Sequence, residues 1–196
     1  ELRRMMLTAL QQDGPVAFRY PRGAAVGSPL RTPIAPVPVG KAEVLEEGDN
    51  VVLLAIGAVV VEALKARALL SEHGVQATVV DARFVKPLDA GLATELARRI
   101  PRIVTVEENV RQGGFGSAVL EALSDAGLSS VAVERIGLPD GFVEHGSQAL
   151  LRSRYGLDAA AIAAATRRFL RQNEPLSDAE PFLRTDRASA LRRSTL

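Results

Sequence analysis

The segment from Lys41 to about Arg171 alternates short apolar runs with stretches of helical pattern, and this alternation restricts the possible folds most strongly. Four runs rich in Val, Ile and Ala are typical of strands buried on both faces, at 51–56, 77–81, 103–106 and 131–136. Such alternation favours a parallel sheet with right-handed crossovers and helices on both faces. We therefore predict an α/β fold with a mostly parallel sheet flanked by helices, with 42–45 as a short edge strand.

Helices between these runs are predicted over 58–72, 90–99, 117–126 and 159–171. Asp89 and Asp158 precede two of them and carry the short carboxylate that caps helix N-termini well. Gly74 is placed to end the first helix, since glycine is favoured just past a helix C-terminus. On that first helix we expect four side chains to face the sheet, namely Ala63, Leu64, Ala68 and Leu69.

The first residues form a separate helix–strand unit. Residues 2–10 place their apolar side chains on one helical face, and Asp13-Gly14-Pro15 ends that helix. Residues 16–20 are predicted to form a strand. This pair is too small to bury its apolar face alone, so we interpret 1–22 as the end of a preceding domain. Since the chain begins inside a helical pattern, we expect it to be a fragment of a longer protein.

The two remaining segments are polar or rich in turn residues. Residues 23–40 contain many prolines and glycines, which indicates an extended connector, although a disordered linker is equally compatible with this composition. Residues 41–171 form the main domain, and 172–196 form a polar tail that we expect to be mobile. Docking of this tail on a partner is the alternative.

Composition excludes several functional classes. The formal net charge is +1, so no overall field favours nucleic acid or a membrane surface. The sequence has no cysteine, which excludes disulfides and thiolate metal sites and suits a reducing cytoplasm. Two histidines are too few for an all-histidine zinc site. No apolar run approaches the roughly 18 residues of a membrane span.

The block Arg19-Tyr20-Pro21-Arg22-Gly23 is the first candidate site. Two arginines lie at a predicted strand end, and guanidinium groups bind phosphate or carboxylate through paired hydrogen bonds. From spacing alone, arginines in structural ion pairs are the more common outcome.

The glycine-rich loop at 113–117 follows a predicted strand and precedes a helix. Its amides could face an anion, but its spacing matches no dinucleotide or phosphate loop, and close packing at a domain or subunit contact is favoured. Glu107 and Glu108 should point in opposite directions, one solvated and one paired with Arg83 or Lys86.

His145 could act as a general base, but no Ser or Asp partner is placed beside it by the sequence. We therefore expect a helix N-cap or an interface position for His145, and we assign no function to His73. These residues provide no complete catalytic set, so we predict no catalytic, cofactor-binding or metal-binding residue within the chain.

Several blocks together resemble the 1-deoxy-D-xylulose-5-phosphate synthase family. They occur in the order and spacing of that family, at 18–23, 79–89, 104–109, 113–117, 137–140 and 144–146. The shorter glutamate and glycine blocks are also similar to those of transketolase C-terminal domains and of the β subunits of 2-oxoacid dehydrogenases. The resemblance implies a transketolase C-terminal-domain-like fold for 41–171 and the end of a pyrimidine-binding domain for 1–22.

The resemblance also implies a function. Members of this family use thiamine diphosphate and Mg²⁺ to join pyruvate to glyceraldehyde 3-phosphate with loss of CO₂, which supplies isoprenoid, thiamine and pyridoxal biosynthesis. It implies that Arg22 binds the substrate phosphate, with Arg19 and Tyr20 as weaker neighbours. The family's cofactor-binding and catalytic residues would lie upstream of Glu1, so this chain alone should bind no cofactor and be inactive.

The resemblance implies a homodimer that forms through the α/β domains, together with the missing N-terminal portion and small-molecule substrates as partners. It implies a cytoplasmic protein that binds neither nucleic acid nor a membrane. Two alternatives stay open. The chain could be a non-catalytic dimerisation or interaction domain that pairs with a separately encoded N-terminal chain. It could also be part of a transketolase or of a 2-oxoacid dehydrogenase β subunit.

Overall fold

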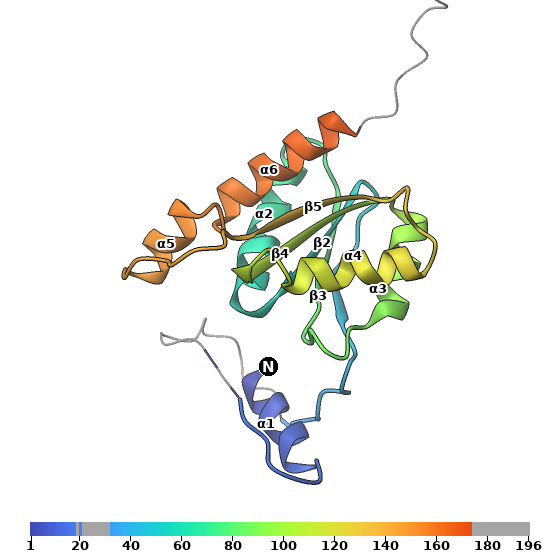
Figure 1. Ribbon diagram of the computed structural model, residues 1–196. Helices are drawn as coiled ribbons and strands as arrows, with labels where there is room; N and C mark the ends of the chain where they lie inside the picture. The colour runs from blue at the N-terminus through green and yellow to red at the C-terminus, as the bar shows by residue number, and fades with distance from the viewer. Residues whose placement is uncertain (19, 21–31, 174–196) are drawn as a thin grey trace, which may run out of the picture.

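The computed structural model describes residues 1–18, 20 and 32–173, and Figure 1 shows a central sheet between two layers of helices. The sheet has the strand order β1-β3-β2-β4-β5. Its strands are β1 (Glu43–Glu46), β2 (Val51–Ile56), β3 (Ala77–Asp81), β4 (Arg102–Val110) and β5 (Ala132–Leu138). The pairs β3–β2, β2–β4 and β4–β5 are parallel. The edge strand β1 pairs with β3 in the antiparallel direction. The predicted α/β fold with a mostly parallel sheet is thus confirmed.

β4 is longer than the apolar run that predicted it. It continues through Glu107 and Glu108 to Val110, which pairs with Leu138 of β5 after an irregularity in register. Because backbone pairing with β5 continues beyond the apolar residues, hydropathy alone ends this strand too early.

Helices cover both faces of the sheet. The helical elements after α1 (Leu2–Leu10) are η1 (Gly57–Val59), α2 (Val60–Ser71), α3 (Ala90–Arg99), α4 (Phe115–Asp125), α5 (Gln148–Arg154) and α6 (Ala159–Gln172), of which α5 lies beyond the end of the sheet. α2 and α6 pack together on one face, around Leu53, Val79 and Val104. α3 and α4 pack together on the other face, around Leu54, Val80 and Ile103. Alternate strand residues therefore enter two separate cores, as expected for a sheet covered on both sides.

The predicted inner face of α2 is only partly right. Ala63 is buried, but Ala68 is exposed, and the other fully buried positions include Ala66 and Leu70. α2 packs on α6 as well as on the sheet, so the buried stripe follows two neighbours rather than one. The apolar pattern of α2 alone does not predict where α6 packs against it.

The N-terminal helix α1 (Leu2–Leu10) extends away from the sheet, as Figure 1 shows, and only its start approaches the loop after β3. Its apolar face remains open, with Leu2, Met6 and Leu10 exposed by 43%, 44% and 82%. Thr8 joins the helix to the connector, since its hydroxyl oxygen accepts the N–H of buried Val37 at 2.7 Å.

The strand predicted at 16–20 is absent from its described residues, 16–18 and 20. A strand needs a hydrogen-bonded neighbour, and no strand in the described ranges pairs with this segment.

Along the described ranges we find no helix with the length and apolar character needed to cross a bilayer.

Asp89 caps the N-terminus of α3, as predicted, and also binds the segment that leads into β1. One carboxylate oxygen of Asp89 accepts the N–H of Leu92 at 3.2 Å, and the other accepts the N–H of Ala42 at 3.2 Å. Asp158 caps α6 in the same way through the N–H of Ala161.

Asp89→Ala should lower the free energy of unfolding by about 2 kcal/mol, because the buried carboxylate caps α3 and also anchors the chain entering β1. Urea denaturation measures the change. The matched control is Asp125→Ala, at the exposed end of α4, which should change stability by less than about 0.5 kcal/mol. Equal losses in both variants would contradict the capping role.

Candidate functional site

Polar side chains gather where β3 and β4 end, at the carboxyl edge at which parallel α/β sheets place their binding residues. Arg83 follows β3 with a left-handed φ of 58°. Its side chain is only 6% exposed and pairs with the carboxylates of Glu1, at 2.6 Å, and of Glu43. The backbone N–H of Arg83 also donates to Asp81 at 3.1 Å. This cluster joins the start of α1 to the sheet.

Burial is the largest of the causes that raise the pKa of Asp81 to about 7, and the hydrogen bond and negative charge of Glu1 act in the same direction. The folded protein therefore holds this proton more tightly than the unfolded chain, in which the pKa of the carboxyl is near 3.8. The stability that this group contributes is fully present below about pH 4 and is lost as the pH rises through about 7.

Asp81→Asn should remove this dependence. The difference in unfolding free energy between the variant and the unmodified chain should move in favour of the variant as the pH rises from 4 to 8. Thermal unfolding at several pH values measures it. A difference that stays constant with pH would show that Asp81 is ionised throughout this range.

Glu107 fills the N-terminus of α4. Its carboxylate, 1% exposed, accepts the N–H of Phe115 at 2.8 Å and that of Gly116 at 2.9 Å. The amides that could have faced an external anion are therefore occupied by a side chain of the same chain, so the anion-binding interpretation of this loop is wrong.

Close packing of the loop is confirmed within the chain. A Cβ on Gly114 would lie 2.2 Å from the Val110 carbonyl oxygen, and one on Gly116 would lie 2.6 Å from the Thr105 hydroxyl. Contact of this loop with another domain or subunit stays a prediction.

Glu108 points away from Glu107, as predicted, but its partner differs. It accepts a hydrogen bond from Arg152 of α5 at 2.7 Å, rather than from Arg83 or Lys86. The sequence pattern did not predict α5, and the guanidinium of Arg83 is already held by Glu1 and Glu43.

His145 is exposed in the loop before α5, and the N-cap of that helix is Ser147, which accepts the N–H of Leu150 at 3.3 Å. The N-cap expectation for His145 is therefore wrong, and an interface position stays a prediction. Arg19 and Arg22 lie outside the described residues. Tyr20 is described and is 66% exposed.

The described residues do not fit a cofactor-bound Mg²⁺. None of them form a group of three His, Asp or Glu side chains that could hold a metal ion. Glu107, the most deeply buried of the described carboxylates, is already bonded to α4. No reaction step can be derived through thiamine diphosphate from these residues.

A comparison with known families identifies the fold. The family described as "Transketolase, C-terminal domain" matches residues 40–162. The chain belongs to the transketolase C-terminal domain family. This agrees with the observed sheet of one antiparallel and four parallel strands.

Relatives of this transketolase C-terminal domain confirm the resemblance of the sequence blocks. The chain is 55% identical over 170 residues to 1-deoxy-D-xylulose-5-phosphate synthase 1 of Geobacter sulfurreducens, covering 87% of this chain and 27% of that protein. It is 54% identical over 179 residues to 1-deoxy-D-xylulose-5-phosphate synthase of Gloeobacter violaceus, covering 90% and 28%. The chain thus spans little more than a quarter of these relatives.

A solved structure described as "Split gene transketolase, inactive beta4 tetramer" is also similar to this transketolase C-terminal domain. It superposes with a TM-score of 0.67 at 36% identity, over 75% of this chain and 48% of that one.

Proposed function

We propose that the chain is the C-terminal part of an enzyme that joins pyruvate to glyceraldehyde 3-phosphate, forming 1-deoxy-D-xylulose 5-phosphate. The observation that carries this proposal is its 55% identity over 170 residues to a synthase of this name. In this proposal thiamine diphosphate and Mg²⁺ bind to the rest of the enzyme, which also supplies the catalytic groups.

The proposed organisation assigns 1–22 to the end of the pyrimidine-binding domain, 23–40 to a linker, 41–171 to the C-terminal domain and 172–196 to a tail.

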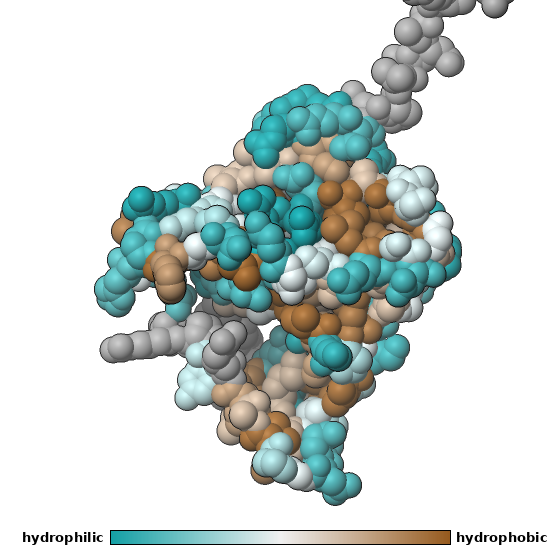
Figure 2. All heavy atoms as spheres, in the orientation of Figure 1, coloured by the Kyte–Doolittle hydropathy of each residue, from teal (hydrophilic) through white to brown (hydrophobic). Residues whose placement is uncertain are grey.

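A homodimer in the cytoplasm is part of the proposal. An apolar area between β5 and α4 supports a subunit contact (Figure 2). Leu120 of α4 is 39% exposed, and Leu128, Val131 and Val133, which follow α4 and run into the start of β5 in the sequence, are only partly buried.

A domain graft tests the proposed activity. The matching region of the Geobacter sulfurreducens relative is replaced by this chain, and product formation is measured with thiamine diphosphate, Mg²⁺ and both substrates. We expect turnover from the chimera and none from this chain alone. A folded chimera without turnover, or turnover by this chain alone, would contradict the proposal.

In the active chimera, Arg22→Ala should raise KM for glyceraldehyde 3-phosphate by roughly tenfold to a hundredfold, because a charge-assisted phosphate contact is worth about 1.5–3 kcal/mol. KM for pyruvate, which carries no phosphate, should change little. Steady-state kinetics with each substrate varied separately measures both constants. Arg98→Ala, an exposed arginine of α3, is the control. Equal effects on the two substrates would argue against phosphate binding by Arg22.

A second candidate is a two-chain enzyme, in which this chain pairs with a separately encoded N-terminal chain. The observation in its favour is the similarity to the structure named a split gene transketolase. Light scattering of this chain, alone and with an N-terminal chain from the same genome, distinguishes the two arrangements. A stable complex with product formation favours the two-chain enzyme.

A further inference from the structure

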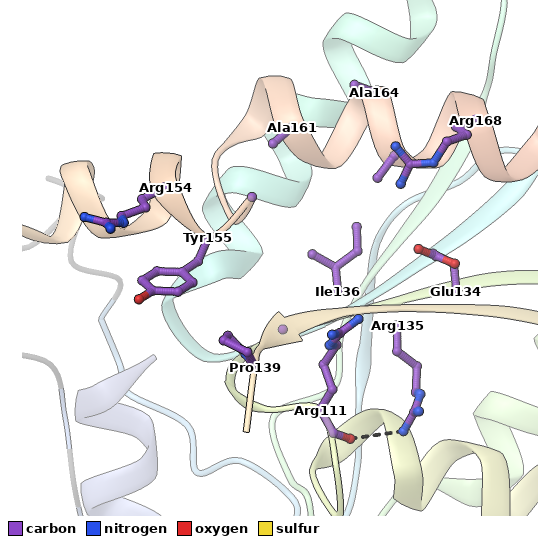
Figure 3. Close-up of a pocket in the computed structure, with 13 residues that line it drawn as sticks. Arg111, Glu134, Arg135, Ile136, Pro139, Arg154, Tyr155, Ala161, Ala164 and Arg168 are labelled. Carbon is purple, nitrogen blue, oxygen red and sulfur yellow. Dashed lines mark hydrogen bonds between the residues drawn. The ribbon is translucent and has the colours of Figure 1, made fainter. Parts of the chain in front are cut away.

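An open pocket of about 520 Å³ lies at the surface between the edge strand β5 and the helices α5 and α6 (Figure 3). This volume is within the range of about 300–1,000 Å³ that small ligands occupy. Two of its sides are apolar: Ile136 and Pro139 on the β5 side, and small residues of α6 opposite, namely Ala161, Ala164 and Ala165. The three alanines share one helix face, and their short side chains leave the space open.

Arginines dominate the charged lining of the pocket. It contains Arg111, Arg135, Arg154 and Arg168, and Glu134 is the one carboxylate among the described lining residues. In Figure 3, the side chain of Arg168 lies along α6, and the guanidinium of Arg111 reaches β5 near the end of that strand. An acidic or neutral ligand would meet a positive environment here.

Two of these arginines are already engaged. Arg154 pairs with Glu144 at 2.6 Å, and a hydrogen bond from Tyr155 lowers the pKa of Glu144, so that carboxylate stays ionised. Arg135 donates to the Arg111 carbonyl oxygen and to the Ser117 hydroxyl, each at 3.0 Å. Arg135 therefore fixes the backbone of Arg111 rather than offering its guanidinium to a ligand.

The other two arginines, Arg111 and Arg168, form no ion pair with any carboxylate in the part of the chain that the structure describes. The stem of Arg111 is nonetheless held in place, since a Cβ on Gly137 would lie 3.0 Å from its Cγ. Arg111 and Arg168 are both exposed, and their guanidinium groups, which pair with no carboxylate of the described residues, border the same open pocket.

We propose that this pocket binds a phosphorylated small molecule of about nucleotide size. Arg111 and Arg168 contact its phosphates, because guanidinium forks match phosphate oxygens. Ile136, Pro139 and the α6 alanines contact its less polar part, with Tyr155 at the rim. None of these lining residues belongs to the sequence block 19–23, and this proposal does not depend on the proposed synthase activity.

Calorimetric titration of this chain with ADP at low salt is the test. We expect saturable binding of one ADP, at least about tenfold weaker in Arg111→Ala and in Arg168→Ala, since each loses a charge-assisted phosphate contact. Arg98→Ala, on α3 and away from the pocket, should bind as the unmodified chain does. Pyrophosphate should compete with ADP, and adenosine should bind more weakly.

Glu134 provides a test in the opposite direction. It faces Arg168 in Figure 3 and repels an anion, so Glu134→Gln should tighten ADP binding several-fold. If an alanine variant unfolds, as circular dichroism would show, the lysine variant at that position takes its place and should bind more weakly, because lysine lacks the fork. No saturable binding at millimolar ADP, or equal binding by all variants, overturns the proposal.

Discussion

Glu107→Ala should lower the free energy of unfolding by about 3 kcal/mol, the largest effect that we expect from a single carboxylate in this chain. The side chain is 1% exposed and accepts two backbone N–H groups at the start of α4. Its removal leaves both buried amides without a partner, at about 1–3 kcal/mol each, and opens a cavity beside them. The cost of burying the carboxylate offsets part of this loss.

The adjacent residue is the matched control. Glu108 is exposed and pairs with Arg152 at the surface, so Glu108→Ala should cost less than about 1 kcal/mol. Urea denaturation of the two variants in the same buffer compares a buried helix cap with a surface ion pair. Losses of similar size would mean that the hydrogen bonds of the buried Glu107 carboxylate to α4 stabilise the fold no more than a surface ion pair does.

Gly114→Ala should also cost about 3 kcal/mol, because the new methyl group has no space. Its Cβ would lie 2.2 Å from the Val110 carbonyl oxygen and 2.3 Å from the Glu107 carboxylate. The first neighbour is backbone that cannot rotate away, and the second can move only by breaking the cap of α4.

Gly141→Ala is the control for this prediction, since nothing lies within 4 Å of its Cβ position and its φ is not left-handed. It should change stability by less than about 0.5 kcal/mol. In the double variant Glu107→Ala/Gly114→Ala, the loss should be smaller than the sum of the single losses, because one of the two clashes is gone. Additive losses would show that the two residues act independently.

The strands and caps of the main domain are predictable from the sequence because their causes are local. A buried strand such as β2 needs an apolar run and little else. Asp89 and Asp158 are predictable as N-caps because the capping bond joins residues only three apart.

The features that sequence reasoning missed depend on distant residues. α5 has no buried residue and hence no apolar stripe to indicate a helix. The partners of Glu107 and Glu108 lie on α4 and α5, which only the fold brings to the end of β4. Arg111 and Arg168 are 57 positions apart in the numbering and meet at one pocket because β5 and α6 are neighbours.

The position of β5 at the sheet edge has a consequence for solubility. Within the described ranges β5 has only β4 as a strand partner, so one side of its backbone can template the addition of a foreign strand. Glu134 and Arg135 place two opposite charges at the middle of this strand, between the apolar Val133 and Ile136. Charged residues at such positions act as gatekeepers against edge-to-edge aggregation, so replacing both with valine would favour fibrous or amorphous precipitation at high concentration.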